Sequence, residues 1–138
     1  MKSKTSSREQ IENSLESTLL LLGDRWTLRI VQSLLSGTKR YNGIKAAISG
    51  ITSRTLTKHL RELEQHGLLT RKITDDRPPH SEYTLTNLGR SLEPCCQELV
   101  AWGKKFAKQQ RSLDSKQSGI SKKKSPIVSQ RKSKRKHN

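Results

Sequence analysis

Cationic and hydroxyl side chains share one short stretch of the sequence, at spacings that place them together on a helix. Arg54, Lys58 and Arg61 recur at steps of four and three. Two hydroxyl residues, Ser53 and Thr57, lie beside them. Such side chains bind phosphate oxygens and contact base edges in a DNA groove. An isolated helix with this composition is more often only a solvated face, so the chemistry depends on the elements that position it.

The residues around this stretch predict a helix that begins after Thr52 and stops at Gly67. Thr52 is an expected N-cap, because its side-chain oxygen can accept from the N–H groups of the first turn. Leu56, Leu60 and Leu63 form an apolar stripe on the face opposite the cations. We therefore expect one face of the helix to pack and the other to meet a ligand.

Two shorter helices are expected before it. Asp24 can cap a helix that runs to about Ser36, and Tyr41, Ile44 and Ile48 mark a second helix that ends in a short turn. A helix, a short turn and a polar-faced helix have the order of a helix-turn-helix motif.

Two strands with a stiff tip are expected after Gly67. Leu69, Arg71 and Ile73 alternate with polar neighbours, as do Tyr83 and Leu85, and two prolines hold the tip extended. Arg77 and His80 at this tip can reach a groove or a phosphate, although an ordinary surface hairpin remains an alternative for His80. The predicted fold is mainly α with a small β-hairpin wing, a winged helix-turn-helix with flanking dimerisation helices.

From about residue 22 to residue 106 the chain resembles the HxlR-type winged helix-turn-helix transcription regulators. The matching segments are Leu22-Gly23-Asp24-Arg25-Trp26, Arg40-Tyr41-Asn42, Gly50-Ile51-Thr52-Ser53-Arg54-Thr55-Leu56-Thr57, Leu60-Arg61-Glu62-Leu63-Glu64, Gly67-Leu68, Pro78-Pro79 and Glu82-Tyr83-Thr84-Leu85-Thr86. The resemblance implies a small bacterial cytoplasmic protein, associated with the nucleoid when bound, that binds palindromic operator DNA as a homodimer.

Carried over position by position, the resemblance implies a set of DNA contacts on the recognition helix, before the motif's first helix and on the wing. These residues are Lys39, Arg40, Ser53, Arg54, Thr57, Lys58, Arg61, Arg77 and His80. The sequence departs from the family at His80, where wings commonly have arginine. It also has Asn13 thirteen residues before Trp26, where many members have a redox-sensing cysteine, so thiol chemistry at that position is excluded.

Two apolar stripes outside the motif predict a dimer interface, although burial within one subunit is the alternative. The interface residues expected from these stripes are Ile11, Leu15, Leu19, Leu92, Cys95, Leu99, Trp102 and Phe106. Pro94 predicts a kink or a restart of the second helix. The adjacent cysteines Cys95 and Cys96 favour buried small hydrophobes over a disulfide with each other; a thiol sensor or an intersubunit disulfide is the alternative.

Charge divides the 138-residue chain into parts. The formal charge is +16, and residues 108–138 hold eight Lys and three Arg against Asp114, a net of +10. We expect a flexible N-terminus over residues 1–8, a DNA-binding and dimerisation domain over residues 9–107, and a disordered basic tail over residues 108–138. The tail either adds non-specific phosphate contacts or touches nothing specific.

The sequence argues against several other classes of function. The histidines have no nucleophile at a recognisable spacing, and neither a phosphate-binding glycine loop nor a metal-ligand cluster is present, so no enzyme, cofactor or metal is expected. The sequence has no signal-peptide core and no apolar span of 18 residues, so no membrane contact is expected. The alternatives are an architectural DNA-binding protein driven by the tail and a protein-docking module. The operator and any small-molecule effector are unidentified.

Overall fold

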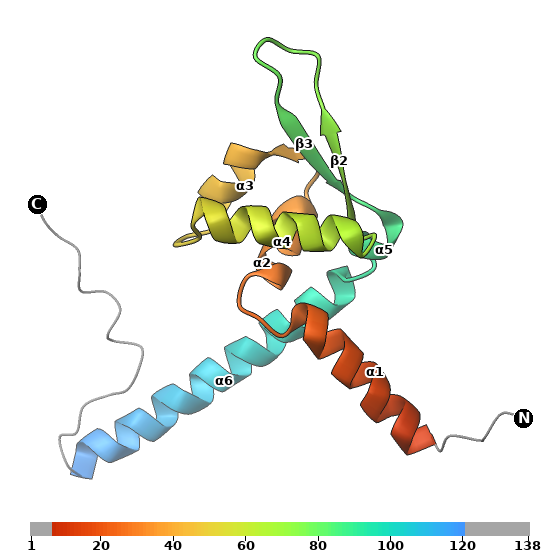
Figure 1. The fold of residues 1–138 in the computed structure, drawn as a ribbon. Coiled ribbons are helices and arrows are strands. Elements are labelled where there is room, and N and C mark those ends of the chain that lie inside the picture. The colour runs from red at the N-terminus through yellow and green to blue at the C-terminus, as the bar shows by residue number, and fades with distance from the viewer. Residues whose placement is uncertain (1–6, 121–138) are drawn as a thin grey trace, which may run out of the picture. The chain divides into compact units, whose positions relative to one another are not determined.

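The computed structural model of the chain describes residues 7–120, which form two compact units that divide after Cys96 (Figure 1). The elements in chain order are α1 (Ser7–Leu22), α2 (Thr27–Leu34), β1 (Lys39–Arg40), α3 (Tyr41–Ala47), α4 (Ser53–Gln65), β2 (Leu69–Ile73), β3 (Ser81–Leu85), α5 (Asn87–Arg90) and α6 (Glu93–Ile120). The fold is mainly helical with a small antiparallel sheet. It is the predicted winged helix-turn-helix.

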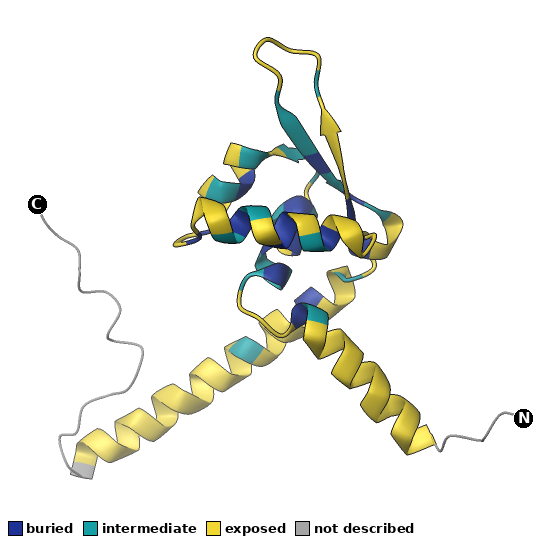
Figure 2. Ribbon diagram, in the orientation of Figure 1, coloured by how far each residue is buried: buried dark blue, intermediate teal, exposed yellow. Residues whose placement is uncertain are grey.

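The first unit is built around one apolar core, to which α2, α3, α4 and the bases of β2 and β3 all contribute (Figure 2). On α4 the predicted leucine stripe is confirmed, because Leu56, Leu60 and Leu63 are at most 2% exposed. Burying a leucine side chain contributes about 1.5–3 kcal/mol relative to leaving it in water. The stripe therefore fixes which face of α4 points outward.

The ends of α4 follow the predicted local signals. The Thr52 side chain accepts from the Thr55 N–H at 3.1 Å, as an N-cap does. After the helix, Gly67 has a φ of +77°, a left-handed conformation that favours glycine. The boundaries of the proposed recognition helix are thus set by its own sequence.

The helix predicted after Asp24 is shorter than expected at both ends. It begins at Thr27 and ends at Leu34, whereas the pattern predicted a run to about Ser36. Asp24 still satisfies its start, because Asp24 Oδ1 accepts from the N–H groups of Trp26 at 2.7 Å and Thr27 at 2.8 Å. The cap therefore acts through a turn that precedes the helix.

The sheet has the order β1-β3-β2, with both neighbours antiparallel to β3. The hairpin of β2 and β3 is the predicted wing, and β1 is an addition that the sequence did not predict. β1 pairs Lys39 with Tyr83 and Arg40 with Glu82. Both predicted strands are confirmed, and the Ile73 side chain at the end of β2 is 57% exposed.

The C-terminal helix restarts near Pro94, as predicted, because α5 ends at Arg90 and α6 begins at Glu93. It then continues to Ile120, beyond the expected domain boundary at residue 107. The expected disorder is therefore wrong for residues 108–120, which are rich in Lys, Arg and Gln, all good helix formers. Ser7 and Arg8, expected to be flexible, are likewise helical. Residues 1–6 and 121–138 lie outside the described residues.

Candidate DNA-binding surface

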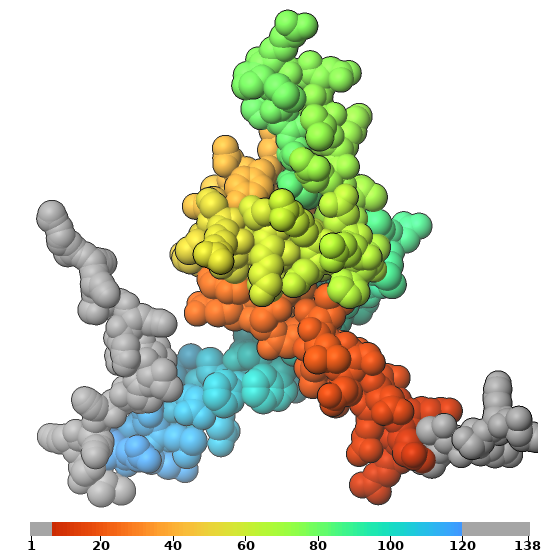
Figure 3. Space-filling view, in the orientation of Figure 1, coloured from red at the N-terminus to blue at the C-terminus, as the bar shows by residue number. Residues whose placement is uncertain are grey.

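The outward face of α4 gathers five of the predicted contact residues around one hollow. These are Ser53, Arg54, Thr57, Lys58 and Arg61. Figure 3 shows the side chains of α4 spread over the face of the molecule turned to the viewer. Within residues 7–120, no carboxylate lies within 4.0 Å of the three cations on this face. Their charge is thus available to a polyanion.

Tyr41 at the start of α3 positions the first turns of α4, a role that the sequence interpretation missed. Its hydroxyl donates to the Ser53 carbonyl at 2.9 Å and lies 3.0 Å from Thr57 Oγ1. The residue type was the one available sign of this role, because the hydroxyl of a half-buried tyrosine needs a hydrogen-bond partner. Sequence alone does not show which partner lies twelve or sixteen residues away.

A second hollow lies between α4 and the wing. It is lined by Thr57, Leu60, Arg61, Glu64, Arg71 and Tyr83. The Arg71 Nε donates to Ser81 Oγ at 3.1 Å across the wing, and Lys72 next to it is exposed. The sequence interpretation named neither β2 cation as a DNA contact. The sequence alone did not show that these two strand side chains are exposed beside α4.

Arg40 has partners within the protein. Its Nη2 lies 2.9 Å from Asp76 Oδ2 at the wing tip, and its Nε lies 3.8 Å from Glu82 Oε2. These groups are half exposed, so each pair stabilises the fold by no more than about 1 kcal/mol. The geometry nevertheless places the Arg40 charge beside two carboxylates, unlike the cations of α4.

The remaining predicted contacts are spread over the wing and the strand before α3. Arg77 is exposed at the tip, whereas Lys39 is half-buried. His80 is half-buried, and its backbone N–H donates to Thr74 Oγ1 at 3.1 Å. A hollow brings His80 together with Arg40 and does not include Arg77. The wing residues thus form a second group, separate from the hollow on α4.

A polar contact joins the start of α2 to the buried side of α4. The hydroxyl of Thr27 donates to Asp24 Oδ2 at 2.7 Å and lies 3.3 Å from Nδ1 of the buried His59. Burial alone would raise the pKa of Asp24, but hydrogen bonds from Thr27 and Trp26, with His59 nearby, hold it below its usual value. The ionised carboxylate is therefore the form that holds this junction.

The two predicted apolar stripes are largely exposed in the single chain. On α1, Ile11, Leu15 and Leu19 are 54–67% exposed. On α6 the exposed members are Leu99, Trp102 and Phe106, and the last two rings stack with centroids 5.2 Å apart. Their exposure within each unit leaves both apolar faces available for a partner.

Two members of the C-terminal stripe differ from expectation. Leu92 packs against the core of its own unit, because it lies in the connection that precedes α6. Of the two cysteines, only Cys96 is buried, and Cys95 is exposed, so the expected burial is wrong for Cys95. Burial, with Cys95 and Glu93 nearby, raises the pKa of the Cys96 thiol. Both thiols are free.

Two other kinds of site are missing from the part of the chain that the structure describes. Residues 7–120 contain no group of three or more His, Cys, Asp or Glu side chains that could hold a metal ion. None of the described helices is long and apolar enough to cross a membrane.

Comparison with known proteins points to one family. Residues 21–111 match the family model described as HxlR-like helix-turn-helix. The chain is 41% identical over 95 residues to YkvN of Bacillus subtilis, an uncharacterized HTH-type transcriptional regulator, covering 69% of this chain and 80% of that protein.

Solved structures agree with this match. The reduced form of the B. subtilis transcriptional regulator YodB has a TM-score of 0.60 at 36% identity, covering 67% of this chain and 91% of that chain. The redox regulator HypR in its reduced form has a TM-score of 0.66 at 35% identity, covering 72% and 98%. The family match over residues 21–111 spans the motif, the wing and part of α6.

Proposed function

Because the chain belongs to the HxlR-like helix-turn-helix family of DNA-binding transcription regulators, which are not enzymes, we propose that it acts as a homodimer on a palindromic operator. The α4 helix lies in the major groove, and the wing contacts the flanking backbone or minor groove. Ser53, Arg54, Thr57 and Lys58 face the bases, and Arg61 binds phosphate. The protein works on nucleoid DNA in the bacterial cytoplasm.

One observation carries this proposal: the hollow on α4 that combines free cations with hydroxyl groups. Cations alone bind any phosphate backbone, whereas side chains that donate and accept at fixed positions discriminate between base edges. Ser53 and Thr57 lie beside Arg54 and Lys58 on a face whose orientation is fixed by the buried leucines behind it. The arrangement supports sequence reading over pure charge attraction.

The exposed apolar side chains of α1 and α6 support the homodimer. Six large apolar residues on these two helices are 48–67% exposed: Ile11, Leu15, Leu19, Leu99, Trp102 and Phe106. Exposed apolar groups at helical spacing favour association with another helix. A two-fold dimer in turn requires two half-sites in inverted orientation, one helical turn of DNA or a multiple of it apart.

An architectural protein that binds DNA without sequence preference is the second candidate, and the charge of the C-terminal segment favours it. Residues 121–138 contain eight Lys and Arg and no Asp or Glu. Selection of bound duplexes from a random library at about 150 mM salt separates the two candidates. An enriched inverted repeat supports the operator-binding dimer, and tight binding with no enriched sequence supports the architectural protein.

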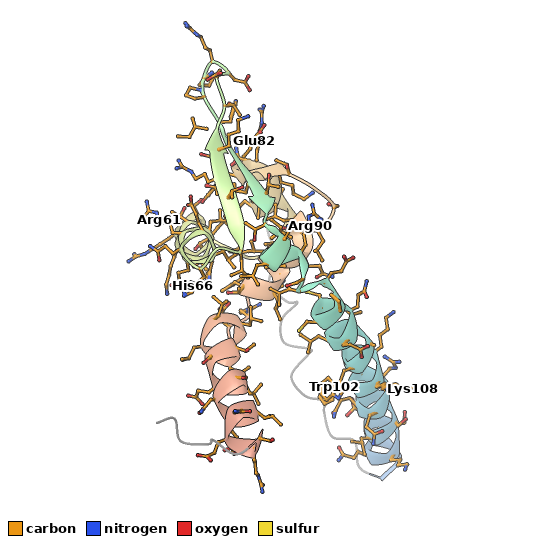
Figure 4. The ribbon with its side chains drawn as sticks, turned by 90° about the vertical axis from the view of Figure 1, so that its right-hand side faces the viewer. Arg61, His66, Glu82, Arg90, Trp102 and Lys108 are labelled. Carbon is orange, nitrogen blue, oxygen red and sulfur yellow. The ribbon has the colours of Figure 1, made fainter. Side chains whose placement is uncertain are left out.

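The base-reading role of α4 is tested by Arg54→Ala, with Arg90→Ala as the matched control. Figure 4 shows Arg61 of α4 and Arg90 of α5 on opposite sides of the first unit, and Arg90 is exposed. We expect Arg54→Ala to weaken binding to the selected operator by about 1–3 kcal/mol, the usual worth of a base-edge contact. Arg90→Ala leaves the affinity unchanged. Equal titration curves for Arg54→Ala and the parent protein would refute the assignment.

A further inference from the structure

The hydroxyl of Tyr41 ties two successive turns of α4 to α3. It donates to the backbone carbonyl of Ser53 at 2.9 Å and lies 3.0 Å from Thr57 Oγ1, within hydrogen-bonding distance. Both partners belong to the DNA-facing hollow, whereas Tyr41 belongs to the helix behind it. The contact therefore connects a supporting residue with a base-reading one.

Counting protons suggests the direction of the second hydrogen bond, in which either oxygen could donate by distance alone. A tyrosine hydroxyl has one proton, and a carbonyl oxygen only accepts. Because the Tyr41 proton is used for the Ser53 carbonyl, we assign Thr57 as the donor to Tyr41. The single proton of Thr57 is then also committed. Its oxygen keeps lone pairs, so toward the groove the Thr57 hydroxyl is an acceptor and no longer a donor.

The identity of the base follows from the pattern of groups in the major groove. Adenine and cytosine present exocyclic amines there, whereas guanine and thymine present only oxygen and nitrogen acceptors and the thymine methyl. An acceptor-only Thr57 can hydrogen-bond to an amine and leaves an acceptor such as guanine O6 unpaired. We propose that Tyr41 is a specificity-determining positioning residue that makes Thr57 favour adenine or cytosine at one position in each half-site.

Immobilisation of Thr57 adds to this effect. The side chain is half-buried and borders both the hollow on α4 and the hollow beneath the wing. A hydroxyl that is already held by Tyr41 loses less rotational freedom when a base arrives, so its contact is stronger than that of a free hydroxyl. The inference rests on the proposed operator binding, because Thr57 reads a base only if α4 enters the groove.

The test uses the full chain and compares Tyr41→Phe with Thr57→Val, which has nearly the same shape as threonine but lacks the hydroxyl. Affinities are measured for the selected operator and for duplexes with each base changed in turn. Thr57→Val identifies the position that Thr57 reads, as the one whose base preference is lost. Thermal unfolding of both variants checks that the fold is retained.

We expect Tyr41→Phe to retain binding to the operator and to lose discrimination only at that position. The preference for an amine base over guanine or thymine, about fivefold for one neutral hydrogen bond, falls toward equality. In the double variant, Tyr41→Phe changes the base preference no further than Thr57→Val alone. These three results together support the proposal.

The opposing outcomes are distinct. A Tyr41→Phe profile identical to that of the parent protein overturns the role of Tyr41 and leaves the proposed operator binding intact. A uniform loss at every position overturns it too, because it shows a structural role only. A preference for guanine or thymine at the Thr57 position overturns the assigned hydrogen-bond direction. If the parent protein itself selects no sequence, this inference and the proposed function fail together.

Discussion

Hydrogen bonds made by a few polar residues define how α2 and α4 meet, in addition to their apolar packing. At the start of α2, Asp24 accepts three hydrogen bonds, from the N–H groups of Trp26 and Thr27 and from the Thr27 hydroxyl. The hydroxyl then lies beside His59 of α4. Because hydrogen bonds are directional and apolar contacts are not, this chain of polar groups defines how α2 meets α4.

The pH dependence of stability should report this junction. The pKa of Asp24 is lowered in the folded chain, so its stabilising effect is present in full above the unfolded value near 4. The effect is lost as the pH falls through the lower, folded value. We expect Asp24→Asn to reduce the free energy of unfolding at pH 7 by up to about 1 kcal/mol, because the amide keeps one acceptor oxygen but lacks the charge and the second acceptor that Thr27 uses.

Denaturant titrations between pH 7 and pH 3 measure this effect. The difference between Asp24→Asn and the parent protein should narrow as the pH falls below about 4, because the unfolded parent chain takes up a proton on Asp24 before the folded chain does. Asp114→Asn, which changes an exposed carboxyl group on α6, is the matched control. Parallel pH profiles for Asp24→Asn and the parent would contradict the assigned role.

At the scale of elements, local signals predicted some parts well and could not predict others. The N-cap at Thr52, the stop at Gly67 and the leucine period between them predicted α4, because each acts within a few residues. In contrast, β1 has only two residues, and it is a strand because Lys39 and Arg40 pair with β3 more than forty residues later. No periodicity can reveal such a short strand.

For the candidate site, too, local sequence signals predicted one part, and contacts between distant residues determined the other. The residue types on α4 predicted its outward face, whereas the hydroxyl contact between Tyr41 and Thr57 depends on how α3 packs against α4. The polar composition after residue 107 was interpreted as disorder, although Lys, Arg and Gln favour a helix once α6 has begun. A polar composition therefore indicates exposure to solvent but does not show where a helix ends.

The packing of α5 against the turn before β2 depends on a glycine. A Cβ added at Gly89 would lie 2.1 Å from the Leu68 carbonyl oxygen and 3.0 Å from a methyl carbon of Leu85. The backbone of α5 or of Leu68 must therefore shift to make room for the added methyl group. We expect Gly89→Ala to lower the free energy of unfolding by about 1–3 kcal/mol.

Gly43→Ala is the matched control for this substitution. Gly43 lies within α3, and the nearest atom to an added Cβ is the Lys39 Cβ, at 3.9 Å. Alanine there should raise stability by about 0.5–1 kcal/mol, because glycine is a poor helix former. Urea titrations of both variants measure the two shifts. Similar midpoints for Gly89→Ala and Gly43→Ala would show that α5 adjusts freely.

At the scale of the whole molecule, the proposed dimer depends on the exposed faces of α1 and α6. We expect Leu15→Asp and Leu99→Asp each to weaken dimerisation at least tenfold, because a charge would be buried in an apolar interface. Ile73→Asp is the matched control, since Ile73 on the wing is 57% exposed and Leu15 is 56% exposed. Sedimentation velocity over a range of concentrations measures the dimer. Identical profiles for Leu15→Asp and Ile73→Asp would contradict the interface.

The C-terminal segment should affect affinity without affecting sequence preference. Because α6 continues to Ile120, the informative truncation ends there and removes eight cations and no acidic residue. Affinity should fall alike for the operator and for unrelated duplexes. The slope of log K against log salt should flatten by about 0.9 for each phosphate that the shortened protein no longer neutralises. A loss of affinity confined to the operator would instead assign the segment a role in base reading.

The order of the sheet has a further consequence for how copies of the chain behave at high concentration. β1 and β2 are the outer strands, and each carries two adjacent cations, Lys39 and Arg40 on one edge and Arg71 and Lys72 on the other. A strand from a second copy would bring the same charges against them, and charged edges of this kind oppose the strand addition that leads to aggregation. The wing can therefore extend away from the core with unpaired edges without competing with the helix-mediated dimer proposed above.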